Sequence, residues 1–164
     1  MGGMLLSLRA LTLTGVPVRS APEGSVEAAL DLLALEDGER FCDLGAGHGN
    51  VLAAARARAD VQAEGFELNP WIALLARLRC LGDRKVKVRC RDSRHADLSG
   101  IAAFYAYLMP KPMAELATTL ERLAPGTRIV SVDFPIPGFQ PLEIREIGPL
   151  RQPVMLYVIG RHRP

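Results

Sequence analysis

The residues best placed to do chemistry are a glycine cluster, Gly45, Gly47 and Gly49, and the acidic side chains that accompany it. Glycines at this spacing let a backbone turn sharply and approach a ligand without side-chain collision. Asp43 precedes the cluster at the end of one strand-like run, and Glu67 closes the next. In open α/β sheets, ligands bind at this carboxyl edge, where a carboxylate can accept hydrogen bonds from both ribose hydroxyls. The pattern therefore predicts a nucleoside-type ligand.

The spacing of the cluster distinguishes between two kinds of nucleoside cofactor. A dinucleotide fingerprint needs G-x-G-x-x-G, which presents a helix N-terminus to a pyrophosphate. Here the third glycine comes one position earlier, Asn50 follows it, and Asp43 would repel a pyrophosphate. S-adenosylmethionine carries a sulfonium and an ammonium, which suit an acidic neighbour. We therefore expect S-adenosylmethionine and not NAD.

Two further residues, Asp92 and Ser93, end the third strand-like run, where an adenine ring would lie. The Asp92 carboxylate can accept a hydrogen bond from the exocyclic amine of adenine; the alternative is that it caps a helix or turn. The predicted cofactor-binding residues are Asp43, Gly45, Ala46, Gly47, Glu67, Leu68, Asp92 and Ser93.

Strand-like runs and helical patterns alternate along the chain, which predicts a parallel sheet covered by helices on both faces. The last two strands are joined by a loop too short for a helical crossover, so they should pair antiparallel. The expected fold is α/β and Rossmann-like, a mostly parallel seven-stranded sheet with a C-terminal antiparallel strand. The expected strands are 40–44, 62–68, 86–92, 102–107, 128–134, 142–147 and 154–160.

Helix starts are marked by capping residues. Ser25 is expected to cap the first helix, and Asn69 to cap a later one with Pro70 at its first helical position. That later helix carries an apolar stripe with arginines opposite, as an amphipathic helix does. The stripe consists of Trp71, Leu74, Leu75, Leu78 and Leu81.

Composition narrows the class of protein. The 164 residues fit one domain, which we place at 25–164 after an N-terminal arm at 1–24. The net charge of +2 and the arginines interleaved with apolar residues argue against nucleic-acid binding. No run of eighteen apolar residues exists, although the apolar arm could contact a membrane peripherally; ordinary packing is the favoured reading.

The cysteines exclude two other classes of site. Cys42, Cys80 and Cys90 have no metal-ligand spacing and cannot all pair. We expect no metal, buried thiols of a reducing compartment, and a cytoplasmic protein.

At the level of motifs, the chain resembles the class I S-adenosylmethionine-dependent methyltransferases. Within that class it is similar to the archaeal-type protein-lysine methyltransferases and their mitochondrial relatives, which modify the ADP/ATP carrier and ATP-synthase subunit c. The matching stretches are Asp43–Gly47, Gly65–Trp71, Pro125–Ser131 and Leu156–Gly160, so the resemblance covers roughly residues 20–162.

This resemblance implies a seven-stranded methyltransferase fold, S-adenosylmethionine as methyl donor and a protein lysine as acceptor. Asp43, Gly45, Gly47, Glu67 and Asp92 fall on the family's cofactor-binding positions. Three features differ from the family pattern: His48 with Asn50, the short Ser20-Ala21-Pro22 segment, and the stretch 104–110.

Tyr107, nearest the end of the fourth strand, is predicted to line the acceptor channel, with Tyr105 expected on the opposite face. The alternative is that both tyrosines are packing residues. The loop Tyr107-Leu108-Met109-Pro110 lacks the polar residue typical of base-amine methylation, and no cysteine nucleophile lies near it. Ribose methylation, a small-molecule acceptor and a non-catalytic S-adenosylmethionine-binding domain stay open as alternatives.

Overall fold

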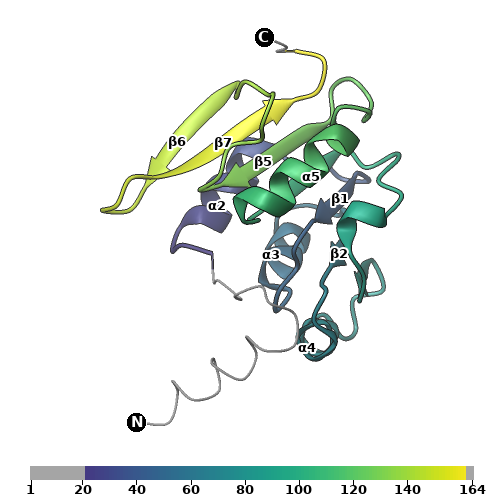
Figure 1. The fold of residues 1–164 in the computed structure, drawn as a ribbon. Coiled ribbons are helices and arrows are strands. Elements are labelled where there is room, and N and C mark those ends of the chain that lie inside the picture. Colours follow the sequence, from purple (N-terminus) through teal and green to yellow (C-terminus); the bar gives the residue numbers. More distant parts are fainter. Residues whose placement is uncertain (1–20, 162–164) are drawn as a thin grey trace.

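Seven strands form one sheet, in the order β3-β2-β1-β4-β5-β7-β6, in the computed structural model, which describes residues 21–161 (Figure 1). Neighbouring pairs among the first five strands are parallel, while β7 runs antiparallel to both β5 and β6. The predicted sheet and its C-terminal antiparallel strand are confirmed. The strands are β1 Arg40–Asp43, β2 Gln62–Phe66, β3 Val86–Arg89, β4 Ala103–Ala106, β5 Arg128–Val132, β6 Glu143–Ile147 and β7 Gln152–Val158.

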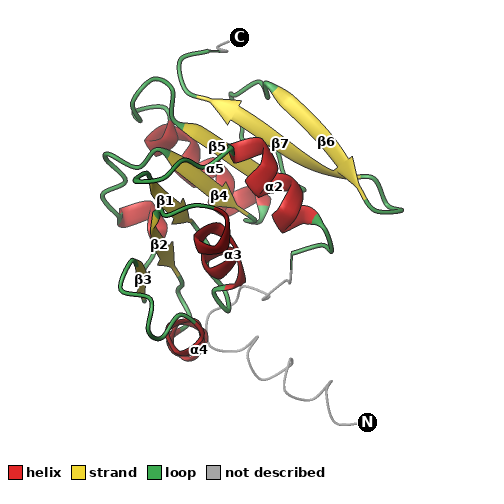
Figure 2. Cartoon of the chain, turned by 180° about the vertical axis from the view of Figure 1, so that it is seen from behind, coloured by secondary structure: helices red, strands yellow, loops and turns green. Residues whose placement is uncertain are grey.

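Helices cover both faces, as expected from the alternating pattern (Figure 2). One core cluster joins α2 (Ser25–Leu33) and α3 (Asn50–Arg58) to one face of the sheet. The other joins α5 (Pro110–Leu120) to the opposite face. Strand β7 serves both clusters, since Val154 and Leu156 point to the first and Met155 and Tyr157 to the second.

The remaining helices are α4 (Pro70–Arg79) and the single 3₁₀ turn η1 (Ser93–His95). Asn69 caps α4 as predicted, because its side chain accepts from the backbone N–H groups of Trp71 and Ile72. Ser25 does not cap α2. Gly24 holds the N-cap position in the left-handed region, and the Ser25 hydroxyl donates to the Pro22 carbonyl at 2.7 Å.

The apolar stripe of α4 exists, but it does not pack on the sheet, and Arg77 and Arg79 flank it instead of lying opposite. Trp71, Leu74, Leu75, Leu78 and Leu81 are all exposed, and the buried residues of the helix are Ile72, Ala73 and Ala76. Gly49, at the start of α3, leaves no room for a larger neighbour, since a Cβ built there would lie 3.3 Å from the Ala76 Cβ. This contact therefore requires a small residue at position 76.

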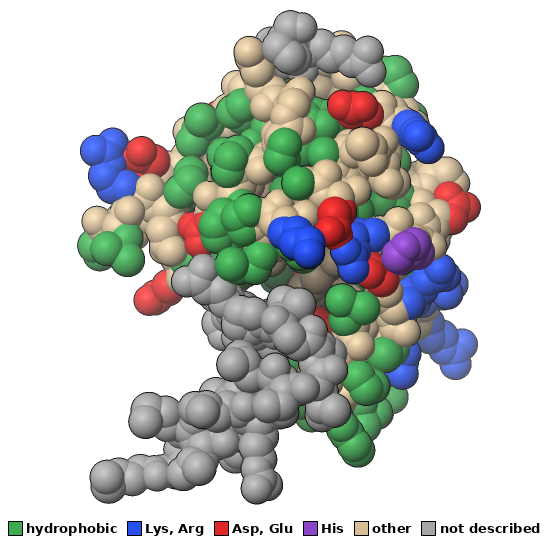
Figure 3. Space-filling model, viewed as in Figure 1, with side chains coloured by type: hydrophobic (Ala, Val, Ile, Leu, Met, Phe, Trp, Pro, Cys, Tyr) green, Lys and Arg blue, Asp and Glu red, His purple; other side chains and the backbone are tan. Residues whose placement is uncertain are grey.

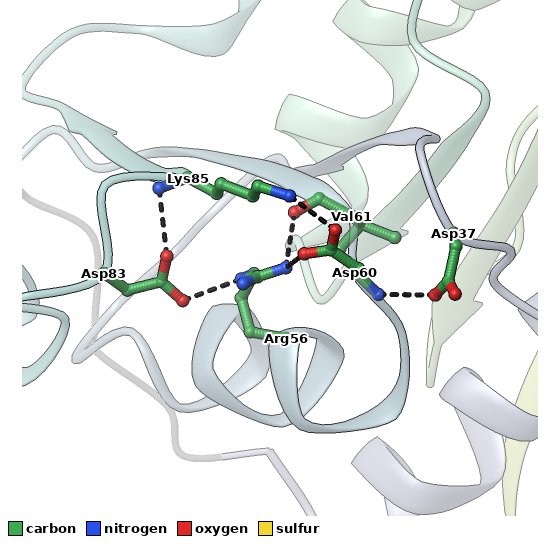
Figure 4. A network of polar contacts seen from close by, with 6 residues as sticks. All are labelled: Asp37, Arg56, Asp60, Val61, Asp83 and Lys85. Atoms are coloured by element: carbon green, nitrogen blue, oxygen red, sulfur yellow. Dashed lines mark hydrogen bonds and ion pairs between the residues drawn. The ribbon is translucent and has the colours of Figure 1, made fainter.

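A polar network ties α3 to the amino ends of β2 and β3, away from the glycine cluster (Figure 4). The Arg56 guanidinium donates to Asp83 Oδ2 at 2.7 Å, to Asp60 Oδ1 at 2.8 Å and to the Val61 carbonyl at 3.0 Å. These contacts hold the pKa of Asp83 below its ordinary value, chiefly through the hydrogen bond from Arg56. The network fixes the end of α3, whose other end forms the glycine loop.

Residues 1–20 and 162–164 lie outside the described part of the chain, and with them most of the predicted N-terminal arm and its suggested membrane contact. Within residues 21–161, no helix is long and apolar enough to cross a membrane.

Candidate cofactor-binding site

The glycine loop connects β1 to α3 at the carboxyl edge of the sheet. Gly47 and Gly49 have φ values of 48° and 80°, which other residues rarely adopt. The Ala46 N–H donates to the Phe66 carbonyl at 2.7 Å, so the loop leans on the end of β2. Gly65 makes this possible, since a Cβ there would come within 2.7 Å of Ala46 and Leu52. The loop is thereby held at the edge where both predicted carboxylates emerge.

Asp43 is a buried carboxylate in which only one of the two oxygens has a hydrogen-bond partner. The Gly45 N–H donates to Oδ1 at 3.0 Å, while Oδ2 is buried and has no hydrogen-bond partner in the structure. Burial, with a smaller contribution from the charge of Glu67, raises the pKa of Asp43 to about 7. An unpaired buried carboxylate is costly, so the site suits a cationic group that would satisfy it. The ammonium of S-adenosylmethionine fits this requirement.

Glu67 lies just beyond β2 and is held by two backbone groups. Its Oε2 accepts from the Gly47 N–H at 3.0 Å, and its Oε1 accepts from the Asn69 N–H at 2.8 Å. Each oxygen keeps a lone pair, so the carboxylate can still accept from two hydroxyls. The arrangement fits the predicted ribose contact.

Asp92 caps the turn η1, which was the alternative to a contact with adenine. Its Oδ1 accepts from the Arg94 N–H at 2.9 Å and caps η1, and its carboxylate pairs with the Arg94 guanidinium. The hydrogen bond from Arg94 lowers the pKa of Asp92. Ser93 beside it is buried and Leu68 is half exposed. The contact of Asp92 with adenine stays a prediction, and the carboxylate that would make it already pairs with Arg94.

The two tyrosines lie on the same side of the sheet, so the expectation of opposite faces was wrong. Residues two apart in a strand share a face. Both pack on the core cluster of α2 and α3. Tyr107 is partly buried just past the end of β4, while Tyr105 is buried and its hydroxyl interacts with the Ser25 side chain. Tyr107 as a wall of the acceptor channel stays a prediction.

Tyr105 was missed as a site residue. Strand pairing places it directly beside Asp43, and burial, with the charge of Asp43 next, raises the pKa of its hydroxyl. A buried carboxylate and a buried tyrosine are therefore neighbours at the ends of β1 and β4. The sequence signal was present in the strand ends, but it required the register between β1 and β4.

The structure also gives the exposure of the positions that differ from the family pattern and the state of the three cysteines. His48 and Asn50, which depart from the family pattern, are both exposed. Among residues 21–161, no group of three or more His, Cys, Asp or Glu side chains could hold a metal ion. Cys42, Cys80 and Cys90 form no disulfide, but only Cys42 is buried and Cys90 is exposed, unlike the buried thiols expected.

The family model described as the ANTKMT methyltransferase domain matches residues 43–143, which is more than half of the chain. The chain belongs to this family. It is a methyltransferase, with a Rossmann-like methyltransferase fold and S-adenosylmethionine as its cofactor.

The chain is also similar to named relatives. It is 34% identical to the adenine nucleotide translocase lysine N-methyltransferase of Mus musculus, covering 79% of this chain and only 58% of the mouse protein. It is 30% identical to a protein-lysine N-methyltransferase of Saccharolobus islandicus, covering 90% of this chain and 96% of the archaeal one. Among solved structures, an RNA methyltransferase of Salinibacter ruber with bound S-adenosyl-L-homocysteine superposes with a TM-score of 0.81. It is 26% identical, and the match covers 89% of this chain and 97% of that one.

Replacing Glu67 by alanine is expected to weaken S-adenosylmethionine binding by about 1–3 kcal/mol, the usual penalty for losing hydrogen bonds at a buried polar group. Isothermal titration measures the change. NAD should not bind the wild-type protein, because its pyrophosphate would meet Asp43. Glu64→Ala, three residues earlier in β2 and paired with Arg89, is a matched control. Wild-type affinity in Glu67→Ala would place the ribose elsewhere.

Proposed function

We propose that this methyltransferase modifies the side-chain amine of a lysine in a protein substrate. The observation that carries the proposal is the similarity to the archaeal protein-lysine N-methyltransferase, which extends over nearly the full length of both chains. The mouse relative, also named for a lysine, supports the same acceptor chemistry. A cytoplasmic location is part of the proposal, supported by three cysteines that form no disulfide.

The residues present divide the work between donor and acceptor. The cofactor supplies an electrophilic methyl group on a sulfonium. Asp43 and Glu67 would hold its ammonium and ribose, which fixes the methyl group relative to the ends of β1 and β4. Positioning of this kind, together with exclusion of water, is the main contribution a protein makes to an in-line displacement.

A lysine acceptor must lose a proton before it can attack. With an ordinary pKa of about 10.4, deprotonation at pH 7 costs roughly 4–5 kcal/mol. An apolar, aromatic wall favours the neutral amine by desolvation. Tyr107, with Leu108 and Met109 after it, provides such a wall beyond the end of β4. Leu108 also reaches the glycine loop, since a Cβ on Gly45 would lie 3.0 Å from its Cδ2.

Replacing Tyr107 by alanine is expected to reduce turnover by about tenfold or more, because the slot that orients and desolvates the amine opens to water. Donor affinity should stay within about twofold, since we assign the ring to the acceptor. Turnover and donor binding are measured separately, with Tyr107→Phe as the matched control that keeps the aromatic wall. Unchanged turnover in Tyr107→Ala would mean that this tyrosine only contributes to packing.

The second candidate is an RNA acceptor, favoured by the similarity to the Salinibacter ruber enzyme. Against base-amine methylation, the loop after β4 offers no Asn, Asp or Ser to orient the amine. Against cytosine carbon-5 methylation, Cys42 lies in β1 and the other cysteines are on α4 and β3 loops. Ribose methylation is the RNA chemistry that these residues leave open.

One experiment separates the two acceptors. A host lysate is incubated with the enzyme and isotopically labelled S-adenosylmethionine, then divided and treated with protease or with ribonuclease. We expect the label to stay with protein and mass spectrometry to place it on lysine. Asp43→Asn, which is expected to bind the donor weakly, serves as the low-activity control. Label that is released by ribonuclease and not by protease would overturn the lysine acceptor.

A further inference from the structure

Helix α4 carries an exposed apolar ridge that the methyl-transfer site does not use. The ridge consists of Trp71, Leu74, Leu75 and Leu78, which are 69%, 43%, 50% and 56% exposed. At helical spacing these four lie on one face, opposite the buried Ile72, Ala73 and Ala76. Figure 3 shows hydrophobic side chains gathered at the end of the molecule where α4 lies. Apolar patches of this kind usually mark an interaction surface.

A strip of positive charge begins on the same helix. Residues 68–91 hold seven basic side chains and one acidic one, an excess of six positive charges, whereas the whole chain has an excess of two. The rest of the protein is therefore net acidic. All seven basic side chains of this strip are exposed: Arg77, Arg79, Arg84, Lys85, Lys87, Arg89 and Arg91.

Most of this basic strip is available to an external partner. Lys85 pairs with Asp60, and Arg89 pairs with Glu64. Within residues 21–161, the other five have no ion pair. In Figure 3 a group of Lys and Arg side chains lies beside the hydrophobic end of the molecule. Arg77 and Arg79 flank the ridge on its two sides, about 90–110° around the helix from its centre.

We propose that the α4 ridge and the basic strip form a surface that docks onto a lipid bilayer containing anionic phospholipid. The convex ridge of leucines would enter the interfacial region, as the apolar face of an interfacial helix does. Trp71 suits the headgroup level, where amphipathic aromatic rings concentrate. The flanking arginines and the strip would contact lipid phosphates, whose surface potential attracts clustered basic residues.

A bilayer fits this combination better than a nucleic acid. RNA binding uses basic side chains and aromatic stacking, but it gives no role to three exposed leucines in a row along a helix face. The position of the ridge is also informative. Trp71 follows Glu67 by four residues, so docking would present the edge of the sheet that holds the cofactor site close to the bilayer surface.

Trp71 is the only tryptophan in the chain, so its fluorescence reports on the ridge in the full-length protein. The protein is titrated with phosphatidylcholine vesicles and with vesicles in which about a third of the lipid is phosphatidylglycerol. We expect water-exposed emission in buffer, a blue shift with the anionic vesicles, and much weaker binding to the neutral ones. Lipids brominated in the acyl chain near the headgroup should quench the shifted emission.

Two variants test the two parts of the surface. Leu75→Ser with Leu78→Ser should reduce binding to anionic vesicles by about tenfold or more, because two partly buried leucines would be lost from the interface. Arg79→Gln with Lys87→Gln should reduce binding to anionic vesicles by about fivefold for each charge removed, and it should make this binding less sensitive to salt. Leu150→Ser is the matched control, since Leu150 is 82% exposed on the β6–β7 turn at the other edge of the sheet.

Each other occupant of the ridge gives a distinct result that overturns the proposal. Blue-shifted emission in buffer alone means that residues 1–20 or a second copy already cover Trp71. Concentration-dependent self-association that is lost in Leu75→Ser with Leu78→Ser identifies the second copy. Equal binding of wild type and both double variants to the vesicles excludes this surface. If the leucine variant binds RNA with the wild-type affinity and the wild-type protein does not bind the vesicles, the basic strip is a nucleic-acid surface. Donor binding by every variant verifies that it is folded.

Discussion

Replacing Asp43 by asparagine is expected to weaken S-adenosylmethionine binding by about 100-fold or more at pH 7. The donor's ammonium would then meet a buried amide in place of a carboxylate oxygen, and breaking a buried charge pair by removing one partner costs several kcal/mol. Asparagine keeps an oxygen for the Gly45 N–H, so the loop should hold its shape. Isothermal titration measures the loss, and Asp97→Asn, the same change on an exposed loop, is the control.

The raised pKa of Asp43 adds a pH dependence to donor binding. Without donor, Asp43 is protonated below its pKa of about 7, and pairing with an ammonium requires the ionised form. Wild-type affinity should therefore rise between pH 5 and 6.5, approaching tenfold per pH unit, with release of a proton on binding. Titration in two buffers of different ionisation enthalpy detects that proton. A pH-independent affinity in this range would contradict the assignment.

The same shift fixes the sign of an effect on stability. The folded protein without donor binds a proton at Asp43 that the unfolded chain, with an ordinary aspartate pKa of about 3.9, has already lost. This term therefore makes the free energy of unfolding fall as the pH rises from about 4 to 7. Asp43→Asn should lack that part of the fall, which denaturant titrations of both proteins at several pH values can measure.

The second large effect is a rise in activity with pH. For a lysine acceptor, kcat/KM should increase about tenfold per pH unit between pH 7 and 9, because the free-amine fraction of a group with pKa of about 10.4 grows by that factor. The measurement needs the substrate found in the lysate experiment and saturating donor, so that titration of Asp43 and of the donor's ammonium does not enter.

Two controls make the pH profile decisive. The same substrate with its target lysine replaced by arginine should show no methylation at any pH. Donor binding and circular dichroism across the range verify that the protein stays folded. A flat profile would count against lysine and favour an acceptor that does not titrate, and ribose or small-molecule acceptors would then become the leading candidates.

The sequence by itself determined most of the residues at the carboxyl edge of the sheet, where the candidate cofactor site lies. The alternation of strands and helices requires a parallel sheet, and consecutive carboxyl ends then meet at one edge. Asp43 and Glu67 are brought to the glycine loop for that reason, and the positive φ of Gly47 and Gly49 meets a requirement visible in the residues themselves. The start of α4 was equally local, since Asn69 and Pro70 act on the first turn that follows them.

Only the tertiary structure showed which face of a helix is covered and which residues of neighbouring strands are paired. A helical stripe shows that a helix has an apolar face, but not whether that face is covered. In α4, Ile72, Ala73 and Ala76 are buried and the leucines are left outside, and the contact at Gly49 admits only a small residue at position 76. Strand register paired Tyr105 with Asp43, and β7 entered the sheet between β5 and β6. Each outcome depends on contacts between parts of the chain, or between side chains in space, that residue type and spacing do not encode.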